Sequence, residues 1–450
     1  MSAFFFRNLK KNYPVVASAT GVRITDTDGR VYLDGCSGAV VANLGHGFGE
    51  INDAIKEQLE QVAFAHTTQF VSKAGLTLAE KIVELTPPGF REGARVYFMS
   101  GGSEAVETAL KMARSYFVHL GENQRTVCLS RWQSYHGSTF GALSATGHLA
   151  RRKPYEPMLP AHLHVCADYR YRCKCGFAPG PCSNIECSIA IADELESAIL
   201  AAGPENVMAF IAEPIVGATL GAAVPGRSYF PRVREICDKY GVLLIADEVM
   251  TGLGRTGTAF GMDHFNVVPD IIVLGKGMAA GYQPLAAVVA AGRVVKAFED
   301  SSGIFEHGFT YSAHPVACAA GLATIEYVRK HNLIERVRAG ESDLFKRAEE
   351  LLNTGIIGDI RGKGFMMGLE FVKDRKTKEP FSAEIRISQL VAQEAMKSGL
   401  LIYPGSGFID GVNGDHIMVA PPFTITDNEI GELFEKLKEA LIRVSKQLLS

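Results

Sequence analysis

Hydrophobic and polar positions along the middle of the chain alternate in a way that predicts helices and strands following one another. From about Thr77 to Ala323, segments with a helical period are separated by short apolar runs that end at charged residues, glycine or proline. Residues 104–120 predict a helix, for example, and residues 126–129 predict a strand. This alternation predicts an α/β fold with a mostly parallel main sheet.

Three of the apolar runs lead directly, or through one glycine, into charged residues. In chain order they are residues 207–212 with Glu213, residues 242–246 with Asp247, and residues 271–274 with Lys276. Uniformly apolar runs of this kind are typical of parallel strands buried on both faces. Ligands bind at the carboxyl ends of strands in open parallel sheets, so we expect Glu213, Asp247 and Lys276 to converge on one crevice.

Lys276 is the strongest candidate for chemistry among these three residues. It follows a predicted buried strand, and Gly275 and Gly277 flank it. An ammonium in such a place is costly unless it is neutralised, paired or used in catalysis. The pattern therefore indicates a lysine that forms a Schiff base.

The length of the chain predicts more than one domain, because 450 residues exceed what a single core holds. Two strands joined by an Asp-Gly turn are expected within residues 21–34, and further strands are expected at 368–372 and 416–420. We divide the chain into three parts. Residues 1–60 form an N-terminal segment that covers the small domain or a subunit interface. Residues 61–323 form a large domain, and residues 324–450 form a C-terminal small domain.

Charge and hydropathy exclude several classes of partner. A net charge of −3 and a pI near 6.5 provide no basic surface for nucleic acid or an anionic membrane, so small neutral or acidic molecules are expected. The apolar residues 3–6 precede Arg7, the wrong order for a signal peptide, and no apolar stretch is long enough to span a bilayer. We predict a soluble, cytoplasmic protein.

Five of the nine cysteines lie close together in the sequence. They are Cys166, Cys173, Cys175, Cys182 and Cys187. The last four could hold a structural zinc ion, but Cys-x-Cys followed by wider gaps departs from the usual Cys-x2-4-Cys spacing. Thiols are the default in a reducing compartment, so we predict an inserted loop with reduced thiols and no bound metal.

Three short motifs are ambiguous when each is taken alone. Residues 252–257 match the dinucleotide pattern G-x-G-x-x-G, but the residues that follow are a poor helix start, so no nicotinamide site is predicted. Gly102 and Ser103 begin a helix, which suits either a phosphate site or an ordinary N-cap. Tyr135 and His136 follow a strand, where they could face a planar ring, or pack or form hydrogen bonds.

Taken together and in this order, the motifs resemble the class III, fold-type I aminotransferases that use pyridoxal 5′-phosphate. The resemblance runs from about Asp28-Gly29-Arg30 to Pro421-Pro422-Phe423 and is strongest to the ω-amino acid/amine:pyruvate branch, the omega-transaminases. It implies that Lys276 holds the cofactor as an internal aldimine and later moves the proton between the substrate Cα and the cofactor C4′. It also implies that Asp247 pairs with the pyridine nitrogen and keeps it protonated.

The resemblance implies further roles around the cofactor. Gly102 and Ser103 match the phosphate cup, Tyr135 and Val249 match the residues on the two faces of the ring, and Thr310 matches a phosphate ligand donated by the partner subunit. The active unit is then expected to be a homodimer. His136 and Glu213 complete the implied cofactor-binding set.

The chain also departs from the family pattern at positions that concern substrates. Met250 stands where related enzymes often carry a glutamine near the cofactor 3′-oxygen. Met418 and Tyr403 stand where two branches carry the arginine that receives a substrate carboxylate, and Met cannot replace Arg in bidentate recognition. Arg255 is a weak substitute, and we interpret it instead as a salt-bridge residue near the dimer interface.

The departures suggest a particular substrate choice. Without the usual arginines, 2-oxoglutarate is not expected as the acceptor, and Glu213 is expected to be unpaired beside the pocket. Glu213 would then favour a distal ammonium, so that a diamine or ω-amino acid donates nitrogen to pyruvate. The alternative is an amino acid racemase or epimerase of the same family. A catalytically silent cofactor-binding protein is disfavoured by the intact Lys276 and Asp247.

Overall fold

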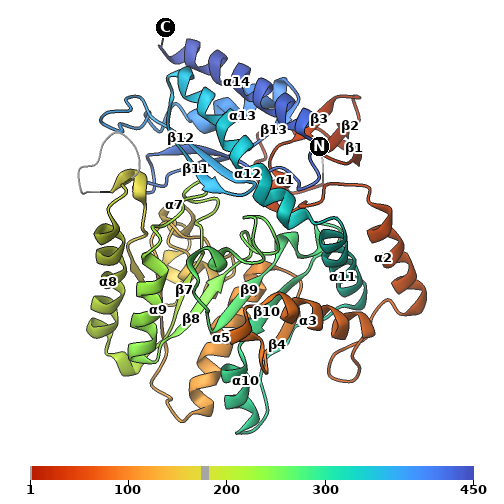
Figure 1. Cartoon of the computed structure of the whole chain (residues 1–450), viewed down its shortest axis with the longest axis vertical. Helices are drawn as coiled ribbons and strands as arrows, with labels where there is room; N and C mark the ends of the chain where they lie inside the picture. The colour runs from red at the N-terminus through yellow and green to blue at the C-terminus, as the bar shows by residue number, and fades with distance from the viewer. Residues whose placement is uncertain (1–2, 174–181, 450) are drawn as a thin grey trace.

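The computed structural model describes residues 3–173 and 182–449 (Figure 1), and its main sheet has seven strands. The strand order is β4-β10-β9-β8-β7-β5-β6. Only β10 runs antiparallel to its neighbours, and the remaining pairs are parallel. The strands are β4 (Arg95–Met99), β5 (Val127–Arg131), β6 (Leu163–Val165), β7 (Val207–Ala212), β8 (Leu243–Asp247), β9 (Ile271–Leu274) and β10 (Ala286–Ala290). The prediction of a mostly parallel sheet is confirmed.

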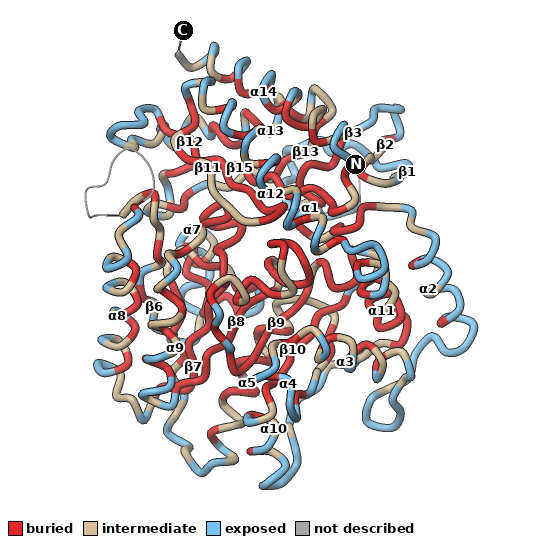
Figure 2. Tube along the Cα trace, in the orientation of Figure 1, coloured by how far each residue is buried: buried red, intermediate tan, exposed pale blue. Residues whose placement is uncertain are grey.

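Helices cover both faces of this sheet, which explains its uniformly apolar strands. Ile211 of β7 packs in one cluster with α5, whereas the adjacent Phe210 packs in another with α8 and α9. Every residue of β7, β8, β9 and β10 is buried (Figure 2). These covering helices are α5 (Gly102–His119), α8 (Ile185–Ala202) and α9 (Tyr229–Tyr240).

A second sheet is antiparallel and lies toward the C-terminal end of the chain, with order β11-β12-β15-β14. Its strands are β11 (Ile357–Lys363), β12 (Met366–Phe371), β14 (Tyr403–Ser406) and β15 (Asp415–Val419). Three long helices accompany it at one end of the molecule (Figure 1). They are α12 (Leu333–Glu349), α13 (Ile387–Lys397) and α14 (Asp427–Leu449). The strands expected at 368–372 and 416–420 are β12 and β15.

The third sheet joins the two ends of the chain. Strands β1 (Val16–Thr20), β2 (Arg23–Asp26) and β3 (Val31–Asp34) form an antiparallel set, and β13 (Leu400–Leu401) pairs in parallel with β3. The expected strand pair within residues 21–34 is therefore present as β2 and β3, while β1 was not predicted. The division at residues 60 and 323 stays a prediction.

The remaining helices are short or pack beside the main sheet. Helices α2 and α3 both contact α11. Their bounds are α1 (Ser37–Val40), α2 (Gly49–Gln61), α3 (Lys73–Leu85), α4 (Pro88–Arg91), α6 (Phe140–Ala145), α7 (Leu149–Arg152), α10 (Gly292–Glu299) and α11 (Pro315–Lys330). Within residues 3–173 and 182–449, none of the helices is both long enough and apolar enough to cross a membrane.

The G-x-G-x-x-G segment forms a series of turns rather than the opening of a helix. Gly257 has a φ of +82°, and a Cβ there would lie 3.0 Å from the Cα of Arg338. The next helical element is a short 3-10 helix, η4 (Gly261–Phe265). These glycines therefore permit a close approach of backbone to α12, which is a packing role.

Candidate active site

The structure brings Glu213, Asp247 and Lys276 together at the carboxyl ends of three adjacent parallel strands. Glu213 directly follows β7, Asp247 is the last residue of β8, and Lys276 follows β9 after Gly275. All three line one cavity of about 710 Å³. The cavity wall also includes Gly102, Ser103, Tyr135, His136, Val249, Met250, Arg151, Arg7 and Tyr403.

Lys276 begins a 3-10 helix, η5 (Lys276–Ala279), and its backbone has a φ of +44°. A positive φ at a residue with a side chain is strained, and such strain concentrates at functional sites. Burial lowers the pKa of Lys276 to about 8, while Glu213 and Asp247 oppose that shift. A larger fraction of this lysine is therefore neutral and nucleophilic near pH 7 than for an exposed lysine.

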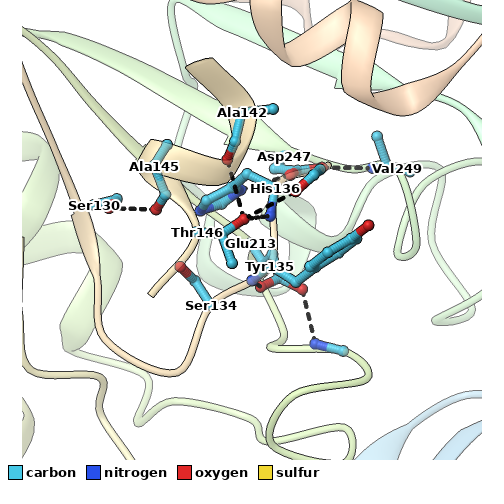
Figure 3. A network of polar contacts seen from close by, with 12 residues as sticks. Ser130, Ser134, Tyr135, His136, Ala142, Ala145, Thr146, Glu213, Asp247 and Val249 are labelled. Atoms are coloured by element: carbon cyan, nitrogen blue, oxygen red, sulfur yellow. Dashed lines mark hydrogen bonds and ion pairs between the residues drawn. The ribbon is translucent and has the colours of Figure 1, made fainter. Parts of the chain in front are cut away.

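Asp247 is held by a histidine and by the backbone (Figure 3). Its Oδ2 lies 2.7 Å from the Nδ1 of His136, and its Oδ1 accepts a hydrogen bond from the Val249 N–H at 3.1 Å. The His136 side chain is fully buried, and its own backbone N–H donates to the Thr146 hydroxyl at 2.8 Å. A carboxylate fixed in this way at a cavity wall can keep a heteroaromatic nitrogen protonated.

Hydrogen bonding is one of the roles that the position of His136 after a strand allows, and the structure shows it. The imidazole contacts Asp247 and orients its carboxylate. Its Nε2 is buried and has no hydrogen-bond partner among the described residues. No local sequence signal connects residue 136 to residue 247, so only the folded chain identifies this pair.

Gly102 and Ser103 form the first turn of α5 at the cavity wall. A Cβ at Gly102 would lie 3.1 Å from the Cγ1 of Val249, so glycine permits this close approach. The Ser103 hydroxyl accepts a hydrogen bond from the Ser138 N–H at 3.0 Å. Backbone N–H groups at the start of an 18-residue helix are suited to binding a phosphate.

Glu213 is bound by backbone amides and not by an arginine. Its Oε1 accepts a hydrogen bond from the Tyr135 N–H at 3.0 Å, and its Oε2 accepts one from the Gly217 N–H at 2.9 Å. Burial raises the pKa of Glu213, and His136 opposes that shift. The expectation that Glu213 is unpaired concerned an arginine partner, and among the described residues two backbone amides satisfy its oxygens instead. It still faces the cavity as a carboxyl group.

Arg255 was predicted to form a salt bridge, but it forms none with the residues that the structure describes. The side chain is fully buried, and it donates to the carbonyls of Phe365 at 2.9 Å and Pro421 at 2.6 Å and to the Asn43 side chain at 2.5 Å. Burial lowers the pKa of Arg255 to about 9. Because these acceptors come from distant parts of the chain, Arg255 connects the N-terminal, central and C-terminal segments.

The other substrate-related positions divide into two groups. Tyr403 and Met250 line the cavity, whereas Met418 is buried in β15 in a cluster with Val40 and Ile215. Thr310 is exposed and lies outside the cavity wall of this chain. A contribution of Thr310 to the site therefore requires a second subunit.

Sequence reasoning missed Arg151, which lies at the end of α7 and lines the cavity. Its guanidinium carbon lies 4.5 Å from the centroid of the Tyr135 ring. The neighbouring Arg152 is buried and donates to the carbonyls of Ser144 at 2.6 Å and Thr146 at 2.8 Å. Two adjacent arginines thus have opposite roles, and nothing in their local sequence distinguishes them.

Comparison with known proteins identifies the class to which this site belongs. The family model "Aminotransferase class-III" matches residues 6–441. An uncharacterized aminotransferase, YodT of Bacillus subtilis (strain 168), is 41% identical over 450 residues, which is 100% of this chain and 99% of YodT. The putrescine–pyruvate aminotransferase of Pseudomonas aeruginosa is 35% identical, covering 98% of this chain and 93% of that protein.

A solved structure agrees with this result. The amine transaminase from an uncultivated Pseudomonas species, determined in its PLP-bound form, is 34% identical with a TM-score of 0.90, covering 98% of this chain and 99% of that one. The chain therefore belongs to the class III aminotransferases and is a pyridoxal-phosphate-dependent transaminase. The residues present suit this cofactor: a lysine with a desolvated ammonium, an oriented carboxylate and the start of a long helix face one cavity.

Proposed function

We propose that this transaminase moves an amino group from an amine or ω-amino acid to pyruvate, with Lys276 as the residue that covalently holds the cofactor. The observation that carries the proposal is that Lys276, Asp247 and Glu213 line one cavity, which the start of α5 also lines. The active unit is a homodimer in which Thr310 of the partner subunit completes the phosphate site. The 61–323 segment forms the cofactor-binding domain.

The residues of the chain divide the chemistry between them. Pyridoxal phosphate, when bound, supplies a sink for the electrons released as the substrate Cα–H bond breaks. The Nζ of Lys276 takes the proton from Cα, which is favoured by its pKa of about 8. Asp247 holds the proton on the pyridine nitrogen, and His136 keeps Asp247 in place. Gly102 and Ser103 would hold the phosphate, and Tyr135 and Val249 would contact the ring, since all four line the cavity.

Glu213 is proposed to select the donor. A buried carboxyl group at the cavity wall interacts favourably with a cationic group, so it favours a donor whose second end carries an ammonium. The similarity to a putrescine–pyruvate aminotransferase supports a diamine in this role. An ω-amino acid carries a carboxylate at its distal end, and that carboxylate requires a cationic side chain in place of Glu213.

The first experiment is to record the visible absorption of the purified protein during addition of single amines without an oxo acid. Diamines and neutral monoamines of matched length form the panel. We expect a diamine to convert the band of the bound cofactor into that of its pyridoxamine form, and pyruvate to restore it. Glu213 confers a faster conversion by diamines than by monoamines. Equal rates for both would remove Glu213 from donor selection.

The racemase alternative gives a different result in the same experiment. In that case the cofactor band persists while an optically pure amino acid loses its optical rotation. In transamination the proton goes to C4′ instead of returning to Cα, and the donor's amino group stays with the cofactor. Pyruvate must then accept that amino group and restore the original absorption band. No cofactor band after addition of pyridoxal phosphate would contradict both alternatives.

Arg151 is proposed to bind the carboxylate of the oxo acid, in place of the arginines absent at Met418 and Tyr403. It lines the cavity, and no carboxylate among the described residues pairs with its guanidinium. Stacking on Tyr135 orients the planar guanidinium beside the predicted ring site.

Replacing Arg151 by alanine is expected to raise the KM for pyruvate by about 10–100-fold, because a charge-assisted hydrogen bond contributes about 1.5–3 kcal/mol. The KM for a diamine donor changes little, since that donor has no carboxylate. Steady-state kinetics with each substrate varied in turn measures the effect. Lys153→Ala, at an exposed neighbouring cation, is the control. An unchanged KM for pyruvate in Arg151→Ala would show that another group binds the acceptor.

A further inference from the structure

Three cysteine sulfur atoms lie together at the beginning of α8, outside the wall of the active-site cavity. Cys173 follows the 3-10 helix η2 (Arg170–Arg172), Cys182 precedes α8, and Cys187 lies in its first turn. The three Sγ atoms are all within 4.8 Å of one another. Cys182 is buried, and the other two are partly exposed.

Backbone hydrogen bonds explain how residues far apart in this segment come together. The carbonyl of Arg170 accepts the N–H of Cys182 at 2.9 Å and that of Cys173 at 3.4 Å. The Arg170 side chain donates to the Asn184 carbonyl at 3.0 Å, so it also binds the chain just before α8. Cys173 and Cys182 therefore lie side by side, which their spacing in the sequence does not reveal. The loop predicted between them lies outside the described residues.

This geometry suits a metal ion. Zinc binds thiolates at about 2.3 Å in a tetrahedral arrangement, which places the sulfur atoms about 3.8 Å apart. Three sulfur atoms within 4.8 Å therefore reach zinc after a small inward adjustment. Thiolates are soft ligands that select zinc over magnesium or calcium. We propose that Cys173, Cys182 and Cys187 bind one structural zinc ion, with water or a further ligand in the fourth position.

The position of the site indicates its purpose. The residues just before Cys173 contact the C-terminal part of the chain. Arg172 pairs with Glu370 of β12 at 2.7 Å, and the Tyr171 carbonyl accepts a hydrogen bond at 2.6 Å from the ammonium of Lys378, which lies between β12 and α13. A metal at Cys173 fixes this stretch where it meets β12. It therefore stabilises the packing of the large α/β part on the C-terminal sheet without taking part in catalysis. Cys175 lies outside the described residues, and the proposal does not depend on it.

The test measures zinc in the purified holoenzyme by mass spectrometry after incubation with zinc sulfate and gel filtration in metal-free buffer. We expect about one zinc ion per protomer in the wild-type protein, since a preformed thiolate site retains its metal. Cys182→Ser and Cys187→Ser lose this zinc. Cys166→Ser is the matched control, because Cys166 is exposed on the same part of the chain and is not in the cluster. Wild-type protein that retains no zinc overturns the proposal.

Cobalt substitution distinguishes ligation from damage to the fold. Wild-type protein loaded with cobalt(II) is expected to show the intense d–d absorption of a tetrahedral thiolate site, and the Cys187→Ser variant lacks it. Transaminase activity, retained in both, shows that the variant is folded, because none of the three cysteines lines the active-site cavity. Equal zinc content in Cys187→Ser and wild type, or a disulfide between two of these cysteines in metal-free wild-type protein, overturns the proposal.

Discussion

Replacing Lys276 by alanine is expected to lower kcat for transamination by at least about 10³-fold, because the variant loses both the nucleophile and the group that moves the proton. The fold is expected to be retained, since the substitution removes a desolvated ammonium, and Asp247 and Glu213 keep their contacts with His136 and with backbone amides. Steady-state rates with a diamine and pyruvate measure the loss. Circular dichroism and gel filtration establish that the protein is intact.

The control for this variant is Lys153→Ala, which removes an exposed lysine from the same chain and leaves kcat unchanged. Reduction with borohydride followed by peptide mass spectrometry gives an independent result. The cofactor is expected on the peptide that contains Lys276 in wild-type protein and on no peptide in the variant. Wild-type activity in Lys276→Ala would remove Lys276 from the mechanism.

The second large effect is expected for Asp247→Asn, with kcat lowered by about 10²–10³-fold, as when a single preorganised electrostatic contact in an active site is lost. The amide is nearly the same size and can still contact His136, but it cannot stabilise a protonated pyridine nitrogen. The half-reaction with a diamine is followed by stopped-flow absorbance. This measures the slowed removal of the proton separately from product release.

Asp300→Asn is the matched control, since Asp300 is an exposed carboxylate whose partner is Lys296. It is expected to keep the wild-type rate. Because Asp247 is buried, its replacement could also change stability, so the thermal unfolding of both variants is measured beside their kinetics. A fully active Asp247→Asn protein of normal stability would show that the ring nitrogen is controlled by another group.

The strands that carry the site could be predicted from the sequence because their signal is local. Uninterrupted apolar residues in β7, β8 and β9 reflect burial on both faces, and the charged residue after each marks the carboxyl end. Convergence of Glu213, Asp247 and Lys276 then follows from the rule that such strands lie parallel and adjacent. Family resemblance added the cofactor and the roles of individual residues.

Other features could not be predicted, because they depend on contacts between residues far apart in the chain. The antiparallel direction of β10, the contact of His136 with Asp247 and the amide partners of Glu213 all arise in this way. The buried carbonyl ligands of Arg255 likewise come from three separate segments. The partners of a side chain depend on which distant segment packs against it. The neighbouring residues in the sequence do not specify that segment.

Arg151 and the cysteine cluster illustrate the same division. The sequence alone determined the α/β class, the mostly parallel sheet and the three charged strand ends. It could do so because a strand buried on both faces consists of consecutive apolar residues. Only the tertiary structure decided that Arg151 faces the cavity while Arg152 is buried, and that Cys173, Cys182 and Cys187 meet. The physical reason is that contacts between residues far apart in the chain, such as the hydrogen bond from the Cys182 N–H to the Arg170 carbonyl, decide where such side chains lie.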